Sequence, residues 1–374
     1  SLLQRATDIT LTYNKAASKT ATGEMSRFML QLMVESGQNI HFKNLNASQN
    51  PLQSIKKPIV KNQEVMRNIY QTDRLSPTAI TTYLRCQMRF YYRYIAGIKE
   101  PDNEEDEIDN RIFGNIFHRA AELFYESKCN KDVVQKQDII NALKDKSLLP
   151  RIIEEAFREK LFNVKDDKNI TYNGLQIINR QVIIEYIKRL LAIDQKLTPF
   201  SILGLEKPIE TPFDINTQEG LKQISLFGNI DRIDKIDENG STCIRVVDYK
   251  TGSNDKTSIK SVDDIFNPEK IESHSDYYLQ ALLYSIMLYN NRNLNPNHLP
   301  VSPALLFIQH AAGDDYTPIL KFGKDIITDI SIYTEDFLIK LKELIEDIFN
   351  PNIAFNPTEN TKRCQYCPYR EICG

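Results

Sequence analysis

The stretch "GNIDRIDKIDENGSTCIRVVDYKTG", from Gly228 to Gly252, decides the fold class of this chain. Apolar and polar residues alternate on both sides of Glu-Asn-Gly, a pattern that predicts a β-hairpin. Asp248 and Lys250, two residues apart near the end of the second strand, should lie on the same face. An acid and a base at a strand end are more often a solvated ion pair of little energetic value than a site. The rest of the chain has to decide between these two interpretations.

Elements on both sides of this hairpin predict an α/β fold. Strand-like sequence begins near Phe200 and forms a three-stranded meander with the hairpin. Periodic apolar residues predict helices before and after the meander, and one more strand follows it. We therefore expect a mixed central β-sheet flanked by helices, with additional helices on its N-terminal side. The predicted helices are residues 111–127, 136–146, 152–162, 175–196, 275–290 and 331–349, and the further strand is residues 303–310.

The N-terminal part of the chain has weaker signals. A strand-like run, "DITLTYN" (residues 8–14), precedes an amphipathic helix at residues 24–35, and the polar sequence that follows predicts a linker. Ser76 and Pro77 then have the N-cap and first-turn chemistry of a helix start. We expect that helix to carry Cys86 and the "RFYYRY" that follows it.

The composition is that of a globular protein with nearly balanced charge. Of the 374 residues, 41% are hydrophobic and 26% are charged, and the net charge is −3. If the chain binds nucleic acid, its basic surface must therefore be local. No window approaches the roughly 18 apolar residues that span a bilayer, and no signal-peptide pattern opens the chain. We expect a cytoplasmic protein and, because the chain begins at Ser1 without a methionine, a piece of something longer.

Four of the six cysteines predict a bound metal or cluster rather than disulfides. Cys364, Cys367 and Cys373 lie in the last eleven residues, "CQYCPYREICG", and Cys86 lies far upstream in "YLRCQMRFYYRY". In an intracellular protein such a group indicates metal or iron–sulfur ligation before it indicates a disulfide. A C-x2-C pair also occurs by chance, so the spacing alone leaves the ligand open.

Several polar residues are candidates for a site, although each taken singly is more often structural. His118 lies beside the apolar face of a predicted helix, where a lone histidine is usually a satisfied core residue. Gly114, one turn earlier, leaves room on that face for another group. Asp231, three residues after Gly228, is by itself most often part of a solvated strand edge. Glu206, at a strand end, means little alone.

The candidates have a chemical meaning only when they are taken together. Gln280 and Tyr284, one helical turn apart, are by themselves a plausible polar pair at the rim of a core helix. One histidine, three acids and a lysine, nearly all beside glycine or at strand ends, are the inventory of a site for metal-assisted phosphodiester hydrolysis. In that chemistry Mg²⁺ binds a few carboxylates and the substrate phosphate. No Ser-His-Asp motif, Walker A loop or GxGxxG sequence competes with this interpretation.

The motifs "GNIFH", "GNIDRID", "VVDYKTG" and "YYLQALLY", in this order and with Glu206 between the first two, resemble those of RecB-family nucleases of the PD-(D/E)XK superfamily. The resemblance covers about Leu75 to Gly374. It implies a restriction-endonuclease-like core with a mixed sheet flanked by helices. It also implies that His118, Asp231 and Asp248 bind the catalytic metal, Mg²⁺ or Mn²⁺.

The same resemblance implies roles for the remaining candidates. The backbone carbonyl of Tyr249 would help to bind the metal, and Lys250 would be the active-site lysine of the D-x-K signature. Gln280 and Tyr284 would match the Q-x-x-x-Y element near the site and the DNA. Glu206 would match an acid often found on the preceding strand, either as a ligand of a second metal or as a partner of the first metal's ligands.

The cysteine segments resemble the iron–sulfur staple of AddB-type helicase–nucleases. There one distant cysteine joins a C-x2-C-x5-C tail to hold a [4Fe–4S] cluster. The ligands implied here are Cys86, Cys364, Cys367 and Cys373. Four thiolates could equally hold structural Zn²⁺, and it is the resemblance that favours iron–sulfur. Such a staple would close a loop of about 280 residues and hold the C-terminus against the nuclease core.

The resemblance predicts three parts: residues 1–35 as the remnant of a helicase-like region, 36–73 as a linker and 74–374 as the nuclease domain. The expected activity is metal-dependent, exonuclease-type hydrolysis of DNA ends or single strands. It would serve double-strand break processing and recombinational repair, with an AddA-like subunit as partner and no membrane partner. Two alternatives stay open: a stand-alone single-strand exonuclease, and a nuclease-fold module that binds DNA or acts as a scaffold without cleaving. A small-molecule phosphohydrolase would need a closed pocket, which a sequence cannot show.

Overall fold

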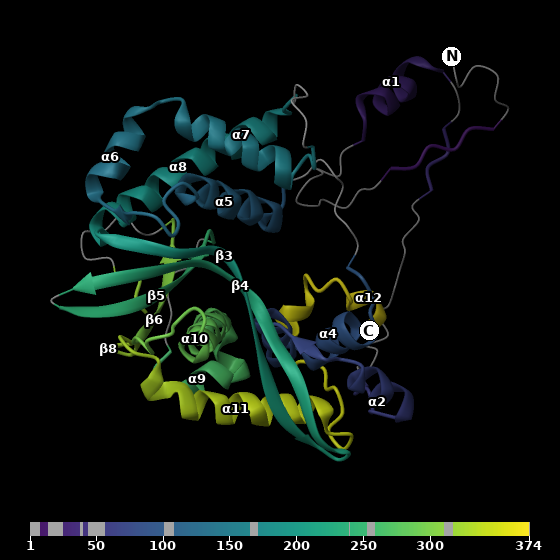
Figure 1. The fold of residues 1–374 in the computed structure, drawn as a ribbon. Helices are drawn as coiled ribbons and strands as arrows, with labels where there is room; N and C mark the ends of the chain where they lie inside the picture. Colours follow the sequence, from purple (N-terminus) through teal and green to yellow (C-terminus); the bar gives the residue numbers. More distant parts are fainter. Residues whose placement is uncertain are drawn as a thin grey trace. The chain divides into compact units, whose positions relative to one another are not determined.

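A six-stranded mixed β-sheet forms the centre of the fold (Figure 1). The computed structural model describes residues 8–13, 25–37, 40–43, 57–100, 108–164, 171–238, 240–252, 259–309 and 317–373. The strands lie in the order β2-β3-β4-β5-β6, and β1 pairs with β4 outside this path. Their bounds are β1 Arg74–Leu75, β2 Val133–Val134, β3 Phe200–Thr217, β4 Gly220–Glu238, β5 Ser241–Lys250 and β6 Val301–Phe307, and β7 Lys321–Phe322 pairs separately with β8 Asp325–Ile326.

The pairing of the strands confirms the predicted mixed sheet. β3, β4 and β5 form an antiparallel meander, and Glu238 at the end of β4 pairs with Ser241 at the start of β5. β6 is parallel to β5, and every residue of β6 is buried. Burial on both faces is typical of a parallel strand covered by helices on each side. The long apolar run of β6 follows from this position.

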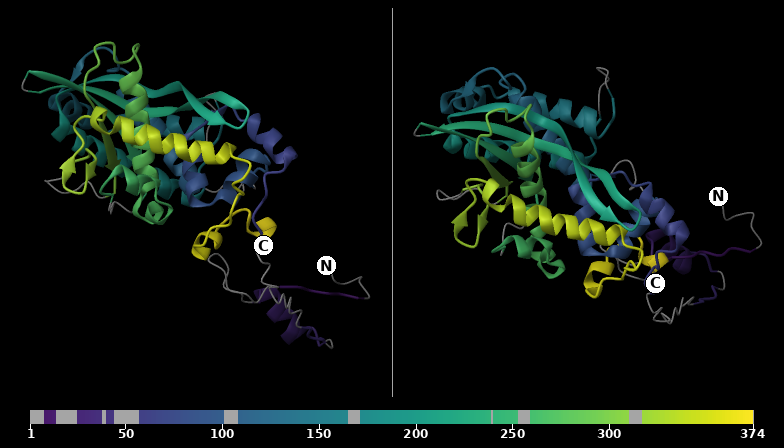
Figure 2. Two further views of the ribbon diagram at one scale, coloured as in Figure 1. Left: turned by 90° about the horizontal axis from the view of Figure 1, so that it is seen from below. Right: turned by 60° about the horizontal axis from the view of Figure 1, so that its bottom comes forward.

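Helices cover both faces of the sheet (Figure 1). Along β5, Val247 belongs to the core formed with α5 to α8, whereas its neighbour Val246 belongs to the core formed with α10 and α11, because alternate strand residues face opposite sides. Figure 2 shows α11, in yellow, running along the sheet. The helices are α2 Gln63–Tyr70, α3 Pro77–Arg85, α4 Gln87–Phe90, η1 Tyr91–Ile95, α5 Asn110–Tyr125, α6 Lys136–Lys144, α7 Leu148–Lys160, α8 Gly174–Leu197, α9 Val262–Phe266, η2 Pro268–Ser273, α10 Ser275–Asn290, α11 Ser331–Phe349, η3 Thr361–Cys364 and α12 Arg370–Cys373.

The helix expected to carry Cys86 is divided in the structure. α3 begins at Pro77 with Ser76 as its N-cap, as predicted, but it ends at Arg85. Cys86 has extended backbone (φ −165°), and the chain then continues as α4 and the π-helix η1. The carbonyl of Arg85 accepts a hydrogen bond from the guanidinium of Arg363, 3.1 Å away, so its partner comes from the C-terminal tail instead of from a continuing helix. The expectation of one continuous helix was therefore wrong.

The chain divides into two units, Ser1–Ser54 and Ile55–Gly374. In the first unit, helix α1, Arg27–Glu35, confirms the predicted amphipathic helix, and the side chain of Ser26 caps it. The strand expected over residues 8–14 does not form in its described part, residues 8–13. A strand needs a partner for its backbone groups, and none of the described residues of this unit pairs in a ladder.

In the second unit, α2 lies within the range expected to be a linker. Lys61, just before α2, donates to three backbone carbonyls at the end of α11 and joins the two elements. None of the helices in the described ranges has both the length and the apolar character needed to cross a membrane.

Candidate active site

Strands β4 and β5 separate at Asp231 and Asp248. The pairing between the two strands ends at Arg232 and Val247, and the two aspartates are the next residues on either strand. There the carboxylate of Asp231 replaces a backbone partner, because its Oδ2 accepts the N–H of Tyr249 at 2.7 Å. Both aspartates are buried, with exposed fractions of 8% and 2%. The fork thus brings two predicted metal ligands to one point of the sheet.

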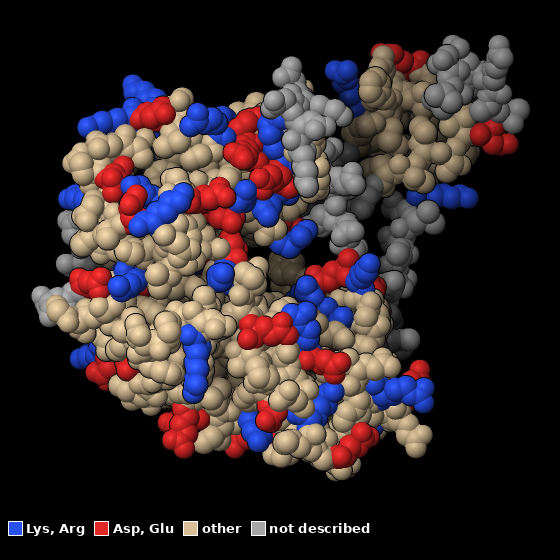
Figure 3. Space-filling view, viewed as in Figure 1, with Lys and Arg blue, Asp and Glu red and all other residues tan. Residues whose placement is uncertain are grey.

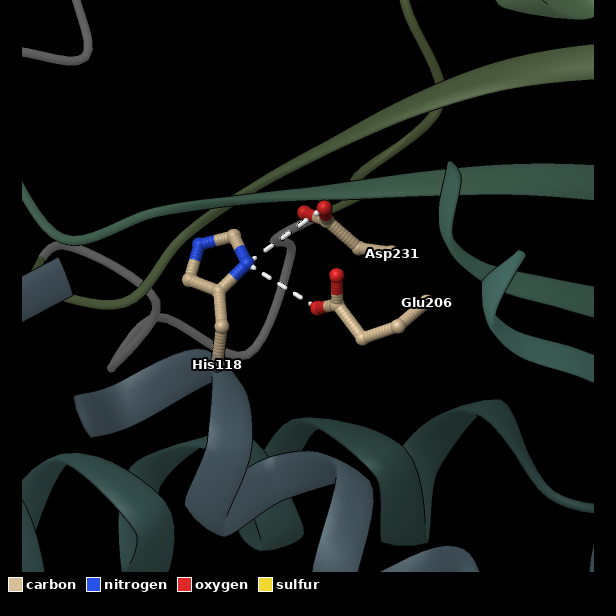
Figure 4. Close-up of side chains that lie close together, drawn as sticks. All are labelled: His118, Glu206 and Asp231. Carbon is tan, nitrogen blue, oxygen red and sulfur yellow. Dashed lines mark ion pairs between the residues drawn. The ribbon is translucent and has the colours of Figure 1, made fainter. Parts of the chain in front are cut away.

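His118 projects from α5 toward Asp231 and Glu206 (Figure 4). Its Nδ1 lies 3.3 Å from Asp231 Oδ1 and 3.4 Å from Glu206 Oε1. Within the described ranges, these three residues form the one group of three or more possible metal ligands whose donor atoms all lie within 4.8 Å of one another. Burial lowers the pKa of His118, but the two carboxylates outweigh burial and raise that pKa to about 10. Without a metal, a protonated imidazole therefore holds the two acids together.

Glu206 reaches this group through an uncommon backbone conformation. Its φ is +42°, and the register of β3 against β4 is irregular a few residues before it. Left-handed backbone costs a residue with a side chain on the order of 1 kcal/mol and persists where the surroundings require it. The two neighbours of Glu206 pair with the two neighbours of Asp231, so the conformation places the carboxylate across from that aspartate.

Asp248, Lys250 and Gln280 form a second cluster on the α10 side of β5. Lys250 Nζ lies 2.7 Å from Asp248 Oδ2 and donates to Gln280 Oε1 at 3.2 Å. Gln280 Nε2 donates to Asp248 Oδ1 at 2.9 Å and closes the ring of contacts. The expected common face of Asp248 and Lys250 is therefore present, with Gln280 bonded to both.

The surroundings raise the pKa of both ionisable groups in this cluster. Burial raises the pKa of Asp248 to about 6, although Lys250 opposes the change. Burial also lowers the pKa of Lys250, but Asp248 outweighs burial and keeps that pKa above its usual value. The lysine is therefore an ammonium at neutral pH, next to a carboxylate that protonates more readily than usual.

Tyr284 lies one turn after Gln280, against the backbone of Gly228. A Cβ atom at position 228 would lie 2.5 Å from Cε1 and 2.7 Å from Cζ of Tyr284, closer than real Cβ atoms approach other atoms. The Tyr284 ring therefore approaches the backbone of Gly228 closely, which only a glycine at this position allows. Gly114 differs, because its Cβ would lie 3.9 Å from Thr251 Oγ1, an ordinary contact distance.

Two neighbours of these clusters escape the sequence-based inference. Tyr277 presents its ring to Lys250, with Nζ 4.6 Å from the ring centroid. Arg232, next to Asp231, is completely buried, and its guanidinium donates to both carboxylate oxygens of Asp194 at 2.8 Å. An arginine inside an alternating apolar strand could have indicated a buried ion pair, whereas nothing in the sequence around Asp194 identifies it as the partner.

Three of the four predicted cluster ligands pack against one small core. Cys86, Cys367 and Cys373 pack against one small core, and the N–H of Cys367 donates to the carbonyl of Cys364. That core consists of Met88, Tyr92 and Tyr369. None of the six cysteines, all within the described ranges, forms a disulfide. Thiols are the donors that iron–sulfur clusters and zinc prefer, but these four do not form a close group of possible metal ligands in the described residues.

The sequence that builds this fork matches a known family. The model of the PD-(D/E)XK nuclease superfamily matches residues 74–374. The chain belongs to the PD-(D/E)XK nuclease superfamily.

The chain is also similar to bacterial proteins that are named as one of the subunits of an ATP-dependent helicase/deoxyribonuclease. It is 26% identical to the protein of Clostridium acetobutylicum over 293 residues, which cover 73% of this chain and 22% of that protein. It is 27% identical to that of Carboxydothermus hydrogenoformans, covering 62% and 20%. It is 27% identical to that of Clostridium perfringens, covering 76% and 23%. The chain thus spans only about a fifth of the length of these curated relatives.

Proposed function

We propose that this chain is the nuclease region of a longer AddB-like helicase–nuclease and hydrolyses phosphodiester bonds of DNA with Mg²⁺ or Mn²⁺. One observation carries the proposal: the fork of β4 and β5 gathers a histidine–carboxylate group and an Asp248–Lys250 pair at one point. In this proposal residues 74–374 are the nuclease domain, 36–73 lead into it and 1–35 belong to a preceding helicase-like region. The similarity to helicase/deoxyribonuclease subunits supports an AddA-like partner and a role in recombinational repair.

His118, Asp231 and Asp248 would hold the catalytic ion, together with the backbone carbonyl of Tyr249. Carboxylate oxygens are preferred ligands of Mg²⁺ and Mn²⁺, and the concentration of buried acids at the fork fits a divalent cation. Glu206, beside His118, would be a further ligand or would orient the imidazole. When bound, such an ion supplies Lewis acidity for phosphodiester hydrolysis.

Lys250 would stabilise the charge that develops on the phosphate. The ammonium of Lys250 forms an ion pair with Asp248 and donates a hydrogen bond to Gln280. With three N–H donors it can also reach a phosphate oxygen, where a positioned cation lowers the energy of the transition state. Gln280, which is hydrogen-bonded to both Asp248 and Lys250, would fix the positions of these two side chains. Tyr284 would hold α10 against β4.

A DNA strand would approach along a hollow beside the sheet. Figure 3 shows the molecule hollowed between the layer of α5 and α8 and the region of α4, with basic and acidic side chains interspersed along the lower rim. In the region of α3 and η1, Arg85 and Arg93 are 41% and 40% exposed. Both pair with acids, Asp276 and Glu100, yet their outer faces can contact a phosphate backbone.

Cleavage of labelled single- and double-stranded DNA with Mg²⁺ or Mn²⁺ tests the proposed activity. Wild type should degrade at least one substrate, and Asp248→Asn should abolish degradation while retaining the contact with Gln280. Asp237→Asn, at a 64% exposed aspartate on β4, is the matched control and should cleave like wild type. A wild type that binds DNA but cleaves none with either metal would instead support a silent binding module.

A [4Fe–4S] cluster held by Cys86, Cys364, Cys367 and Cys373 would link the tail to α4. It would supply a structural link and no chemistry at the fork. Protein purified without oxygen should be brown, absorb at roughly 400 nm and contain iron, and Cys86→Ser should lose both properties. Cys129→Ser, outside this group, should keep them. Stoichiometric zinc without iron would assign the same thiols to a zinc site.

A further inference from the structure

Tyr277 forms a third wall around the ammonium of Lys250. Nζ lies 4.6 Å from the centroid of the Tyr277 ring, besides its contacts with Asp248 and Gln280. Tyr277 precedes Gln280 by three residues on α10, so both side chains project from one helical face. The Lys250 side chain is only 15% exposed between these neighbours. Asp248 and Gln280 have roles in the proposed chemistry, whereas Tyr277 has none.

The Tyr277 ring is itself held in place. His274 stacks on it with ring centroids 4.5 Å apart and an angle of 7° between the planes, and Phe307 of β6 lies 6.1 Å away. His274 has a left-handed backbone, φ +60°, and its buried Nε2 has no hydrogen-bond partner in the described part of the chain. Both features cost free energy. In this conformation the imidazole of His274 stacks on the ring of Tyr277.

An aromatic wall has a specific advantage beside a metal site. Asp248, the closest partner of Lys250, is also a proposed metal ligand. A carboxylate that shares its charge with a divalent ion attracts an ammonium less strongly. The face of Tyr277 attracts the ammonium through the ring quadrupole and does not bind such an ion, so its hold on Lys250 is the same in both states.

We propose that Tyr277, supported by His274, is a positioning residue for Lys250. Its ring keeps the ammonium directed at the substrate phosphate when Asp248 turns to a metal. This inference rests on the proposed nuclease function, but the place of Lys250 can be measured without any cleavage.

Carbon-13 NMR of lysine-labelled, metal-free protein tests the placement directly. The Cε resonance of Lys250, assigned by its loss in Lys250→Arg, should be shifted upfield by the Tyr277 ring current in wild type. Tyr277→Leu should remove the shift, and Tyr277→Phe, which keeps the ring, should retain it. Tyr289→Leu, at a half-buried tyrosine near the end of α10, is the control and should leave it unchanged. Tyr277→Met serves if the leucine variant does not fold. A Lys250 resonance that stays in place without the ring would overturn the proposal.

Kinetics provide the second readout. Tyr277→Leu should lower kcat about tenfold and leave KM unchanged. A tenfold loss corresponds to about 1.4 kcal/mol of activation free energy, which lies within the range of a partly desolvated cation–π contact. Tyr277→Phe should restore kcat. An equal loss in both variants would assign the effect to the hydroxyl and overturn the proposal. If wild type itself cleaves no DNA, the proposed function fails, whereas the NMR comparison still decides where the ring holds Lys250.

Discussion

The ring of Tyr284 on α10 occupies the place that a side chain at Gly228 on β4 would take. This contact joins the helix of Gln280 to the strand of Asp231. The two clusters of the candidate site therefore depend on a glycine that has no chemistry of its own.

Gly228→Ala should destabilise the protein by about 1–3 kcal/mol, because a methyl group there forces the Tyr284 ring out of a packed core. Urea unfolding measures the change. Gly114→Ala is the matched control, because its Cβ would meet Thr251 at an ordinary distance inside helix α5. It should be neutral or stabilise by up to about 1 kcal/mol. Equal losses in the two variants would contradict this role of Gly228.

Asp194→Asn should destabilise the protein by about 3–5 kcal/mol, because it leaves the completely buried guanidinium of Arg232 with less compensating charge. Asp194 also accepts the hydroxyl hydrogen of Tyr125 at 2.7 Å, so the change disturbs α5 as well. Thermal and urea unfolding measure the loss. Asp237→Asn, on the exposed part of β4, should change stability by less than about 0.5 kcal/mol. A neutral Asp194→Asn would show that the buried network is dispensable.

Binding of Mn²⁺, followed by electron paramagnetic resonance, should weaken at least about tenfold in Asp231→Asn, since a neutral amide is a poorer ligand for a hard cation. The amide oxygen can still accept the N–H of Tyr249, so the fold should persist. Glu206→Gln should also weaken binding, whereas Glu210→Gln, at a 49% exposed acid on the same strand, should not. Unchanged affinity in Asp231→Asn would remove this aspartate from the metal site.

Lys61 gives the stability a pH dependence of known sign. Burial lowers the pKa of Lys61 from 10.5 to about 8, although Asp347 opposes the change. Between these values the unfolded chain holds a proton that the folded chain has lost, so the contribution of this group to stability rises with pH. The difference in unfolding free energy between wild type and Lys61→Met should therefore grow by about 2 kcal/mol from pH 7 to pH 9.5.

Lys188→Met, at a lysine with a 49% exposed side chain, is the control for this experiment and should show no such trend. A wild-type advantage over Lys61→Met that shrinks as the pH rises would reverse the assigned sign.

Patterns local to one segment were predictable from the sequence. The bounds of α10, Ser275–Asn290, agree with the prediction because its apolar residues continue to its last turn. The meander was predictable because alternation and the turn residues point to the same strands. The common face of Asp248 and Lys250 follows from the two-residue period of a strand alone.

Features that depend on distant partners were not predictable. The end of α3 depends on Arg363, which reaches the carbonyl of Arg85 from the C-terminal tail. The buried position of Arg232 depends on Asp194, and the sequence around neither residue indicates that the two are partners. The left-handed backbone of Glu206 depends on the irregular register between β3 and β4. Tertiary contacts decide each of these features.

Single-turnover cleavage of end-labelled DNA by wild type and Lys250→Met, with saturating Mn²⁺, tests the proposed nuclease site most directly. Lys250→Met should bind Mn²⁺ and DNA as wild type does but cleave at least about 100-fold more slowly, because only the cation that stabilises the developing charge is missing. Cleavage by Lys250→Met at the wild-type rate, or no cleavage by wild type with Mn²⁺ or Mg²⁺, would contradict the proposed function.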